Sequence, residues 1–193
     1  ERVTQYRQLV AAYQGRFQVE QCPALPALSA NDVDLGAREA LALTSMREQM
    51  AEQCVARVVI GGRLDRYAGR YPGVVEEALL TANRGRALYV VGGFGGAGAA
   101  MAAHLTGGDA VPELTQQWHL QHVPTAATLA PLLAPTPYPL RLDDDLAAAL
   151  PPGGWAALQN GLNSADNERL ATTTDVDEVV ALVLRGLHTV AAL

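Results

Sequence analysis

Arginine and glutamate side chains recur around two predicted turns of this sequence. Arg47 lies in a helical stretch, and Arg63 follows a Gly-Gly pair. Glu76 and Glu77 lie near the start of another predicted helix. An arginine binds phosphate through two parallel hydrogen bonds, and a carboxylate accepts hydrogen bonds from ribose hydroxyls. These side chains suit a phosphorylated, ribose-bearing ligand, while a structural ion pair and favourable placement at a helix dipole remain open on spacing alone.

A glycine-rich loop runs from Gly92 to Gly98. Gly93, Gly95 and Gly98 fit the spacing of a dinucleotide-binding loop, in which the backbone approaches a phosphate and the next helix offers unpaired N–H groups. The acidic residue expected about 20 residues further on is missing from a strand context. A tight strand-to-helix turn therefore explains these glycines equally well.

The other reactive side chains form no recognisable site. The four histidines have no metal-ligand spacing, so we expect no metal and read them as surface or packing residues. Cys22 and Cys54 are interpreted as free thiols, and no base lies near Ser45 or Cys54 in an arrangement that would make a nucleophile. Three aromatic residues lie in the ligand-side loops, where they either stack on a base or fill the loop: Tyr67, Tyr71 and Phe94.

Two repeats of strand, glycine turn and helix position these residues. The predicted elements are a helix at 33–53, a strand at 58–60, a helix at 72–83, a strand at 87–91 and a helix at 99–105. Arg47 falls on or beside the apolar stripe of the first helix, where a charge needs a partner. Val58-Val59-Ile60 lacks alternation, which predicts a strand covered on both faces. The order is typical of an α/β fold with a parallel sheet, in which ligands lie at the carboxyl ends of the strands.

The flanking regions are less regular. A weak helix is predicted at 1–13 and a short strand at Phe17-Gln18-Val19-Glu20. Residues 106–152 hold eight prolines and are read as loops and short helices packed on the sheet. Asp175 caps a closing helix that is apolar on most sides, and we expect that helix to be buried.

Composition narrows the classes of function. The chain of 193 residues has 14 arginines, no lysine and a net charge of −6, which argues against general nucleic-acid binding. Its apolar runs are too short to cross a bilayer, and no signal-peptide pattern opens it, so we expect a cytoplasmic protein without a membrane partner. The first residue is Glu1, and we expect the chain to be part of a longer one.

Four ordered motifs resemble the prokaryotic SLOG family, Rossmann-like domains related to LOG-type nucleotide hydrolases and to the sensor region of melastatin-type TRP channels. The resemblance covers about residues 33–187. The motifs are Leu43-Thr44-Ser45-Met46-Arg47-Glu48-Gln49-Met50, Ile60-Gly61-Gly62-Arg63, Gly69-Arg70-Tyr71-Pro72-Gly73-Val74-Val75-Glu76-Glu77-Ala78 and Leu88-Tyr89-Val90-Val91-Gly92-Gly93-Phe94-Gly95-Gly96. It implies one SLOG-type nucleotide-binding domain over 1–193. Its expected parts are an N-terminal part (1–32), motif-bearing βα units (33–105) and a Pro-rich segment with closing helices (106–193).

The resemblance implies an α/β Rossmann-like parallel sheet with helices on both faces, and a ligand-sensing role. SLOG domains of bacterial anti-phage systems such as the Thoeris effector bind cyclic ADP-ribose isomers and switch an effector, often through oligomer rearrangement. It therefore implies a cyclic ADP-ribose isomer or ADP-ribose as ligand, no further cofactor, a homo-oligomer and a fused or associated effector domain. Such domains normally begin with a strand and a glycine turn, which this chain lacks before Phe17.

By the same resemblance, Arg47, Arg63 and Glu77 contact the ligand, with Glu76 as the alternative to Glu77. The remaining expected ligand-binding positions are Gly61, Gly62, Gly73, Gly93, Phe94, Gly95 and Gly96. Loop 64–71 is expected to close on the ligand. Binding without turnover is favoured, and we expect no catalytic residue.

The hydrolase branch provides the alternative function, a LOG-like nucleotide N-glycosidase (phosphoribohydrolase) in which Arg47 and Glu77 would be catalytic. The family's Gly-Gly-x-Gly-Thr turn is interrupted here, because residues 63–71 separate two glycine pairs and Val74 stands in place of threonine. A nicotinamide-dependent oxidoreductase is a third reading, and the missing acidic ribose ligand argues against it.

Overall fold

The computed structural model describes residues 35–192. The predicted helix at 1–13, the predicted strand at 17–20 and the thiol of Cys22 lie outside the described residues. Cys54 is a free, half-buried thiol. Within residues 35–192, no helix combines the length and the apolar character needed to cross a bilayer.

A parallel pair of strands lies at the centre of the sequence motifs. β1 (Ala56–Ile60) pairs with β2 (Ala87–Val91) in register, so that Ala56 lies opposite Ala87 and Ile60 opposite Val91. α3 (Gly73–Asn83) connects the two strands, as a parallel crossover requires. Every residue of β2 is buried, which agrees with its continuous apolar run.

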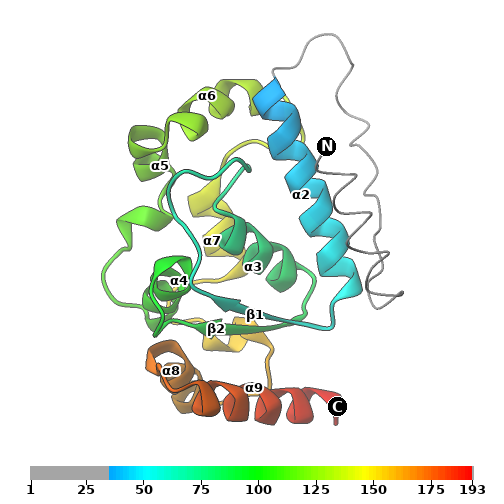
Figure 1. The fold of residues 1–193 in the computed structure, drawn as a ribbon, viewed down its shortest axis with the longest axis vertical. Helices are drawn as coiled ribbons and strands as arrows, with labels where there is room; N and C mark the ends of the chain where they lie inside the picture. Colours follow the sequence, from blue (N-terminus) through cyan, green and yellow to red (C-terminus); the bar gives the residue numbers. More distant parts are fainter. Residues whose placement is uncertain (1–34, 193) are drawn as a thin grey trace, which may run out of the picture.

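One face of this sheet is covered by α2 (Leu35–Gln53), α3 and α4 (Gly96–Thr106), as Figure 1 shows. Val59, Leu88 and Val90 point into this layer and form the main core with apolar residues of the three helices. α2 packs on α3 through buried small residues, among them Ala37 and Ala40, which let the helix axes approach closely. The neighbouring placement of α2 and α3 determines which side chains meet at the site.

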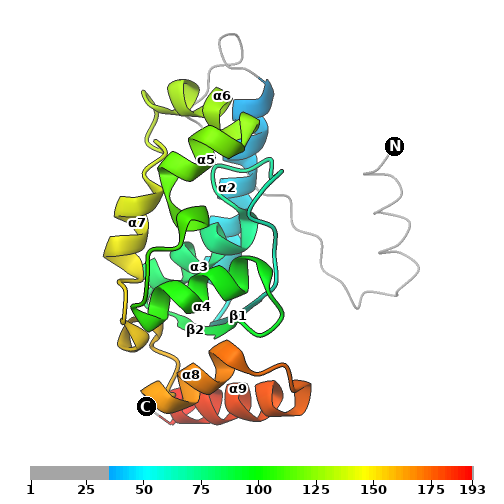
Figure 2. The same ribbon diagram turned by 90° about the vertical axis from the view of Figure 1, so that its left-hand side faces the viewer.

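The opposite face is covered by α8 (Ser164–Thr172) and α9 (Val176–Ala191), which form a separate layer beyond the sheet in Figure 2. Tyr89 is fully buried there and donates a hydrogen bond to the Asn160 carbonyl over 2.9 Å. A Cβ on Gly186 would lie 2.7 Å from the Tyr89 ring, so α9 approaches the sheet where it has no side chain. Helices on both faces of a parallel sheet confirm the α/β, Rossmann-like fold.

The Pro-rich part forms short helices, as predicted for residues 106–152. These are η1 (Pro112–Leu114), α5 (Gln116–His122), α6 (Pro124–Leu133), α7 (Leu142–Ala149) and η2 (Trp155–Leu158). α6 lies beside the N-terminal half of α2 and α5 packs on α6, far from the sheet (Figure 1), so the prediction that this segment packs on the sheet was wrong for these two helices. Asp175 caps α9 by accepting hydrogen bonds from the Asp177 and Glu178 amides, as predicted.

Two burial predictions were wrong. Val58 and Ile60 of β1 are 45% and 48% exposed, because β1 is an edge strand in the described part and α8 and α9, which cover that face, pack mainly against β2. α9 is buried along one stripe, centred on Leu182 and Gly186, because it has the sheet on one side. The helix predicted at 99–105 begins at Gly96, because positive φ angles at Gly95 and Gly96 turn the chain sharply into the helix.

Candidate functional site

A fully buried carboxylate, Glu76, is the centre of the site. The Arg47 Nη1 atom lies 2.5 Å from Glu76 Oε2, and the Thr44 hydroxyl donates to Glu76 Oε1 over 2.7 Å. The Arg70 Nε atom lies 3.4 Å from Oε1. Glu76 belongs to the first turn of α3, Arg47 and Thr44 to α2, and Arg70 to the loop after β1. Three segments distant in the sequence therefore meet at one charge.

The Arg47 guanidinium fits between two glycines. A Cβ on Gly69 would lie 2.6 Å from Arg47 Nη1, and a Cβ on Gly73 would lie 2.8 Å from Nη2. The backbone of loop 64–71 and the start of α3 can approach the guanidinium this closely because neither residue has a side chain. Gly73 was predicted as a site residue, and the structure gives it this packing role.

Glu77 forms a second, less buried ion pair. Its Oε2 lies 2.5 Å from Arg57 Nη1, whereas its Oε1 lies 3.8 Å from Arg47 Nε. Arg57 also donates to the Thr81 hydroxyl over 3.0 Å. Arg47 therefore contacts both glutamates and is closer to Glu76, which the resemblance gave as the alternative position.

Asp145 on α7 extends the cluster. It accepts a hydrogen bond from the Tyr71 hydroxyl over 2.7 Å and lies 3.8 Å from Arg70 Nη2. The Arg70 guanidinium stacks over the Tyr71 ring, 4.4 Å from its centroid. Counting Glu76 and Glu77, three carboxylates face three guanidinium groups, so the cluster is balanced in charge.

Some donors of this cluster have no acceptor. Arg47 Nε, Arg57 Nη2 and Arg70 Nε are buried and make no hydrogen bond within the part of the chain that the structure describes. Buried N–H groups of charged side chains are costly to leave unpaired. The arrangement therefore retains unused donors for a water molecule or a ligand oxygen.

Arg63 stands apart from this cluster. It follows the carboxyl end of β1 and is exposed, and among residues 35–192 it forms no hydrogen bond or ion pair. The sequence pattern predicted that Arg63 and Arg47 meet at one ligand, and the structure does not bring them to a shared partner. Arg63 is a solvated cation at the carboxyl edge of the sheet, where ligands bind in parallel α/β folds.

The two glycine turns bind each other through their backbones. The Gly61 and Gly62 carbonyls accept hydrogen bonds from the Gly98 and Ala97 amides over 2.7 and 2.9 Å. A Cβ on Gly96 would lie 2.2 Å from the Gly62 carbonyl oxygen, so a side chain would separate the turns. These contacts use two first-turn N–H groups of α4, which the sequence had suggested for phosphate.

Of the remaining positions in the glycine loop, some are packed against other segments and some are exposed. The Gly95 amide donates to the Gly92 carbonyl, and a Cβ on Gly93 would lie 2.0 Å from the Thr173 carbonyl oxygen, so Gly93 packs on the end of α8. Phe94 is 45% exposed at the tip of the loop. Hollows of about 300 and 520 Å³ lie elsewhere, near His104 and Arg86, and neither is lined by Arg47, Arg63 or Glu76.

A family model of SLOG cluster 2 matches residues 27–170. The chain belongs to this SLOG family. No curated protein and no solved structure matches the chain. The matched range includes the whole charge cluster, from Thr44 to Asp145. SLOG membership supports a nucleotide-related role.

Four residues of the charge cluster were missed from the sequence. Thr44 precedes Arg47 by one helical turn, a spacing that puts both side chains on one face of a helix, so this signal was readable. Arg70 sits three residues before Gly73 in the motif that carries Glu76. Arg57 and Asp145 gave no local signal, because their partners come from distant segments.

A second buried polar contact anchors loop 64–71. His119 on α5 is buried, and its Nδ1 lies 3.0 Å from the Tyr67 hydroxyl. The Thr125 hydroxyl donates to the Tyr67 carbonyl over 3.1 Å. Burial lowers the pKa of His119, with an opposing effect of the nearby Asp143 charge. Loop 64–71 is thus tied to α5 and α6 at Tyr67 and to Glu76 at Arg70.

The first prediction concerns the Thr44–Glu76 hydrogen bond. Thr44→Val keeps the shape of the side chain and removes the donor to a buried carboxylate, which should lower the free energy of unfolding by about 1–3 kcal/mol. Thr172→Val is the matched control. The Thr44 hydroxyl also lies 3.2 Å from the Ala40 carbonyl, and Thr172 makes the same contact with the carbonyl four residues earlier, but is exposed. The free energy of unfolding of Thr172→Val should stay within about 0.5 kcal/mol of the wild-type value. Equal urea-unfolding free energies for the two variants would contradict the role of Thr44.

The second prediction concerns pH. The folded-state pKa of His119 lies below the unfolded value of about 6.5. The unfolded chain therefore binds more protons below that pH, and the free energy of unfolding should fall as the pH falls from 7.5 to 5.5, by at most about 1.4 kcal/mol per pH unit from this group.

His119→Gln should reduce this pH dependence, because glutamine does not titrate. His122→Gln, at an exposed histidine one turn further along α5, should keep the wild-type dependence. Thermal unfolding at a series of pH values measures this pH dependence for both variants. An unchanged slope in His119→Gln would show that His119 titrates alike in the folded and unfolded states.

Proposed function

We propose that this domain is a sensor for an ADP-ribose-type nucleotide, either a cyclic ADP-ribose isomer or ADP-ribose, that switches an attached or associated effector in a bacterial anti-phage system. The observation that carries the proposal is the buried Arg47–Glu76 pair with its unused N–H donors, placed at the first turn of α3. The start of α3 belongs to the carboxyl edge of the sheet, where ligands of parallel α/β folds bind. The proposal places the protein in the cytoplasm, as a homo-oligomer.

The charges of the site indicate which side chain contacts the ligand first. The buried cluster is already neutral, so a ligand with phosphate groups needs a further cation, and Arg63 is exposed beside the Gly61-Gly62 turn. Arg63 makes the first contact with phosphate, through charge-assisted hydrogen bonds. Phe94, exposed at the neighbouring turn, offers a ring face for the base.

Loop 64–71 is the element that transmits binding. It begins next to Arg63 and ends at Arg70 and Tyr71, which contact Glu76 and Asp145. A ligand held by Arg63 pulls on this loop, and rearrangement of Arg70 frees buried donors for ligand oxygens. The shift is limited to the ligand's difference in affinity for the two loop arrangements.

Binding without turnover is supported by the placement of the glutamates. A catalytic carboxylate must reach the reacting bond, whereas Glu76 is fully buried by Thr44, Arg47 and Arg70. Val74 stands where the hydrolase branch has a hydroxyl, and a Cβ on Gly62 would lie 2.6 Å from its side chain. The alternative, a LOG-like N-glycosidase, is favoured only by the pairing of Arg47 with glutamate.

The third prediction tests the sensor. Calorimetric titration of the purified chain with ADP-ribose, its cyclic isomers, NAD and AMP should show binding of an ADP-ribose-type nucleotide, and chromatography should recover it intact. Arg63→Ala should weaken binding by roughly 10- to 100-fold, the loss expected for a charged hydrogen bond. Because Arg63 has no partner in the described part, folding should be unaffected.

Arg86→Ala is the matched control. Arg86 is also exposed and lies before β2, at the opposite edge of the sheet, so its loss should leave affinity unchanged. Equal affinities of the two variants for the nucleotide would show that Arg63 does not contact it. Release of free base from AMP would favour the N-glycosidase instead.

A further inference from the structure

The middle of loop 64–71 is fastened to the helices at one residue, Tyr67. Figure 1 shows this loop rising from the carboxyl end of β1 toward α5 and α6. The Tyr67 hydroxyl lies 3.0 Å from Nδ1 of His119 on α5, and the Tyr67 carbonyl accepts a hydrogen bond from the Thr125 hydroxyl on α6 over 3.1 Å. The residues on either side of Tyr67 are exposed. A change that loosens Tyr67 therefore frees the middle of the loop.

The two ends of the loop have anchors of their own. Leu64 packs against the main core at one end, and Arg70 and Tyr71 join the charge cluster at the other. Arg66, between them, has a φ angle of +47°, a left-handed conformation that residues with a side chain seldom adopt. The contacts of Tyr67 hold the backbone in this strained shape. An opening of the loop is therefore expected in residues 65–68.

His119 is enclosed too tightly to be hydrated where it lies. It is 3% exposed, and the space beside its ring has a volume of about 10 Å³, which is room for no more than one water molecule. The Trp118 ring packs edge-on against the imidazole at 5.1 Å, and the Tyr67 ring does so at 5.4 Å. A protonated imidazole in this position loses most of its hydration, and that loss is costly.

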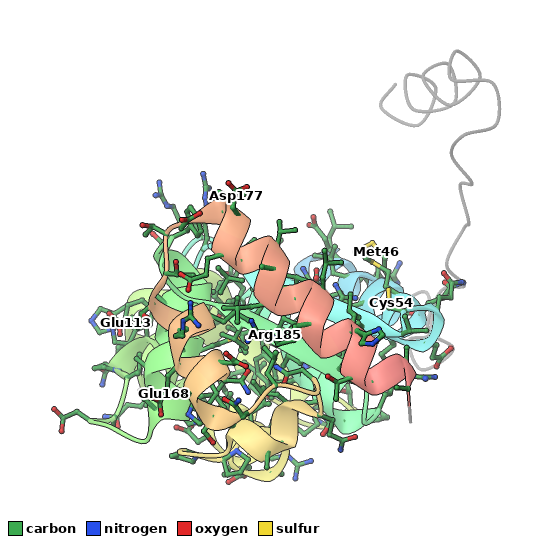
Figure 3. All side chains as sticks on the ribbon, turned by 90° about the horizontal axis from the view of Figure 1, so that it is seen from below. Met46, Cys54, Glu113, Glu168, Asp177 and Arg185 are labelled. Carbon is green, nitrogen blue, oxygen red and sulfur yellow. The ribbon has the colours of Figure 1, made fainter. Side chains whose placement is uncertain are left out.

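Few charges compensate for this loss of water. α6, which packs against α5, has no titratable residue. Asp143 on α7 and the backbone carbonyl of Glu113 in η1 favour the protonated ring, yet burial has the larger effect and lowers the pKa of His119. Glu113 itself lies at the edge of the molecule in Figure 3, and Arg70, which lines the space beside the ring, adds positive charge. The buried ring is therefore neutral at pH 7.5.

Protonation of His119 removes the acceptor of the Tyr67 hydroxyl. This hydroxyl keeps its own proton, because burial and the Glu76 charge raise the pKa of Tyr67. It can therefore donate to Nδ1 of the neutral ring. A protonated imidazole has hydrogen on both nitrogens and accepts no hydrogen bond, so the Tyr67 proton is left without a partner. Both the ring and the hydroxyl then gain hydrogen bonds by exposure to water.

We propose that the hydrogen bond between Tyr67 and His119 is a proton-sensitive latch, which holds residues 65–68 on α5 while the ring is neutral and releases them when the ring gains a proton. Release lets water reach the ring and relieves the strained backbone at Arg66. The ends of the loop stay anchored, so the charge cluster around Glu76 keeps its contacts. Acid therefore opens the part of the loop between the sheet edge and the cluster. This latch belongs to the free protein and does not depend on the nucleotide.

Limited proteolysis of the full chain measures the latch. Trypsin cleaves after arginine in this lysine-free chain, and the Arg66 side chain is 79% exposed. The cleavage rate reports the released fraction when release and reclosure are faster than cleavage. The rate after Arg66 is divided by the rate for a free peptide of residues 61–72 at the same pH. This ratio should rise by about three- to tenfold from pH 7.5 to 5.5, because one proton shifts an equilibrium by at most tenfold per pH unit below about 6.5.

His119→Gln separates the proton from the contact. Glutamine offers an acceptor to the Tyr67 hydroxyl but does not titrate, so the ratio should match the wild type at pH 7.5 and lack the rise at pH 5.5. His122→Gln, at an exposed histidine of the same helix, should keep the rise. No rise in the wild type, or an equal rise in His119→Gln, would overturn the proposal. An equal rise after Arg57 in β1 would overturn it too, because the whole domain would then be unfolding.

Tyr67→Phe keeps the test decisive if His119→Gln does not fold. It removes the hydroxyl and keeps the ring, so the ratio at pH 7.5 should rise by roughly 2- to 10-fold, as expected for the loss of one hydrogen bond. Tyr138→Phe is the matched control, because Tyr138 is also half-buried and lies beside Arg70, but its hydroxyl bonds to no residue in the described part of the chain. Equal ratios for the two variants would show that the Tyr67 hydroxyl does not hold the loop.

Discussion

The burial of the Glu76 carboxylate is the constraint on which the site depends. A charge removed from water needs opposite charge and hydrogen bonds, and removing one partner from such a pair typically costs about 3–5 kcal/mol. Arg47, Thr44 and Arg70 provide these partners from α2 and from the loop after β1. The carboxylate therefore fixes α2, loop 64–71 and α3 relative to one another, and the glycines beside Arg47 let the backbones come close enough.

This arrangement gives the site a closed interior, the buried charge cluster, and an exposed rim at the two glycine turns. Three guanidinium groups and three carboxylates neutralise each other inside, while Arg63 and Phe94 are exposed at the two glycine turns. The two glycine turns are bound to each other through the first N–H groups of α4, which fixes their positions relative to one another. The loop from Arg63 to Arg70 connects rim to interior. Under the proposed function, this connection is the route by which nucleotide binding would reach the rest of the protein.

The sequence allowed the βαβ order, the parallel sheet and the need of Arg47 for a partner to be predicted, because periodicity and turn glycines are local signals. It could not choose between Glu76 and Glu77. Adjacent helical residues point about 100° apart, and only the position of α2 decides which one is buried. Arg57 and Asp145 were missed for the same reason. Burial of Val58 and Ile60 was overestimated because a β-branched run looks the same in a central and an edge strand.

Backbone amide chemical shifts during titration with ADP-ribose test the central claim most directly, because they locate the ligand on the folded chain. The account predicts that the largest changes fall on Gly61, Gly62 and Arg63, on the turn around Phe94, and on loop 64–71 as it responds. Changes confined to other surfaces, such as the hollow beside His104, or no changes at saturating nucleotide, would contradict a nucleotide site at the carboxyl ends of these strands.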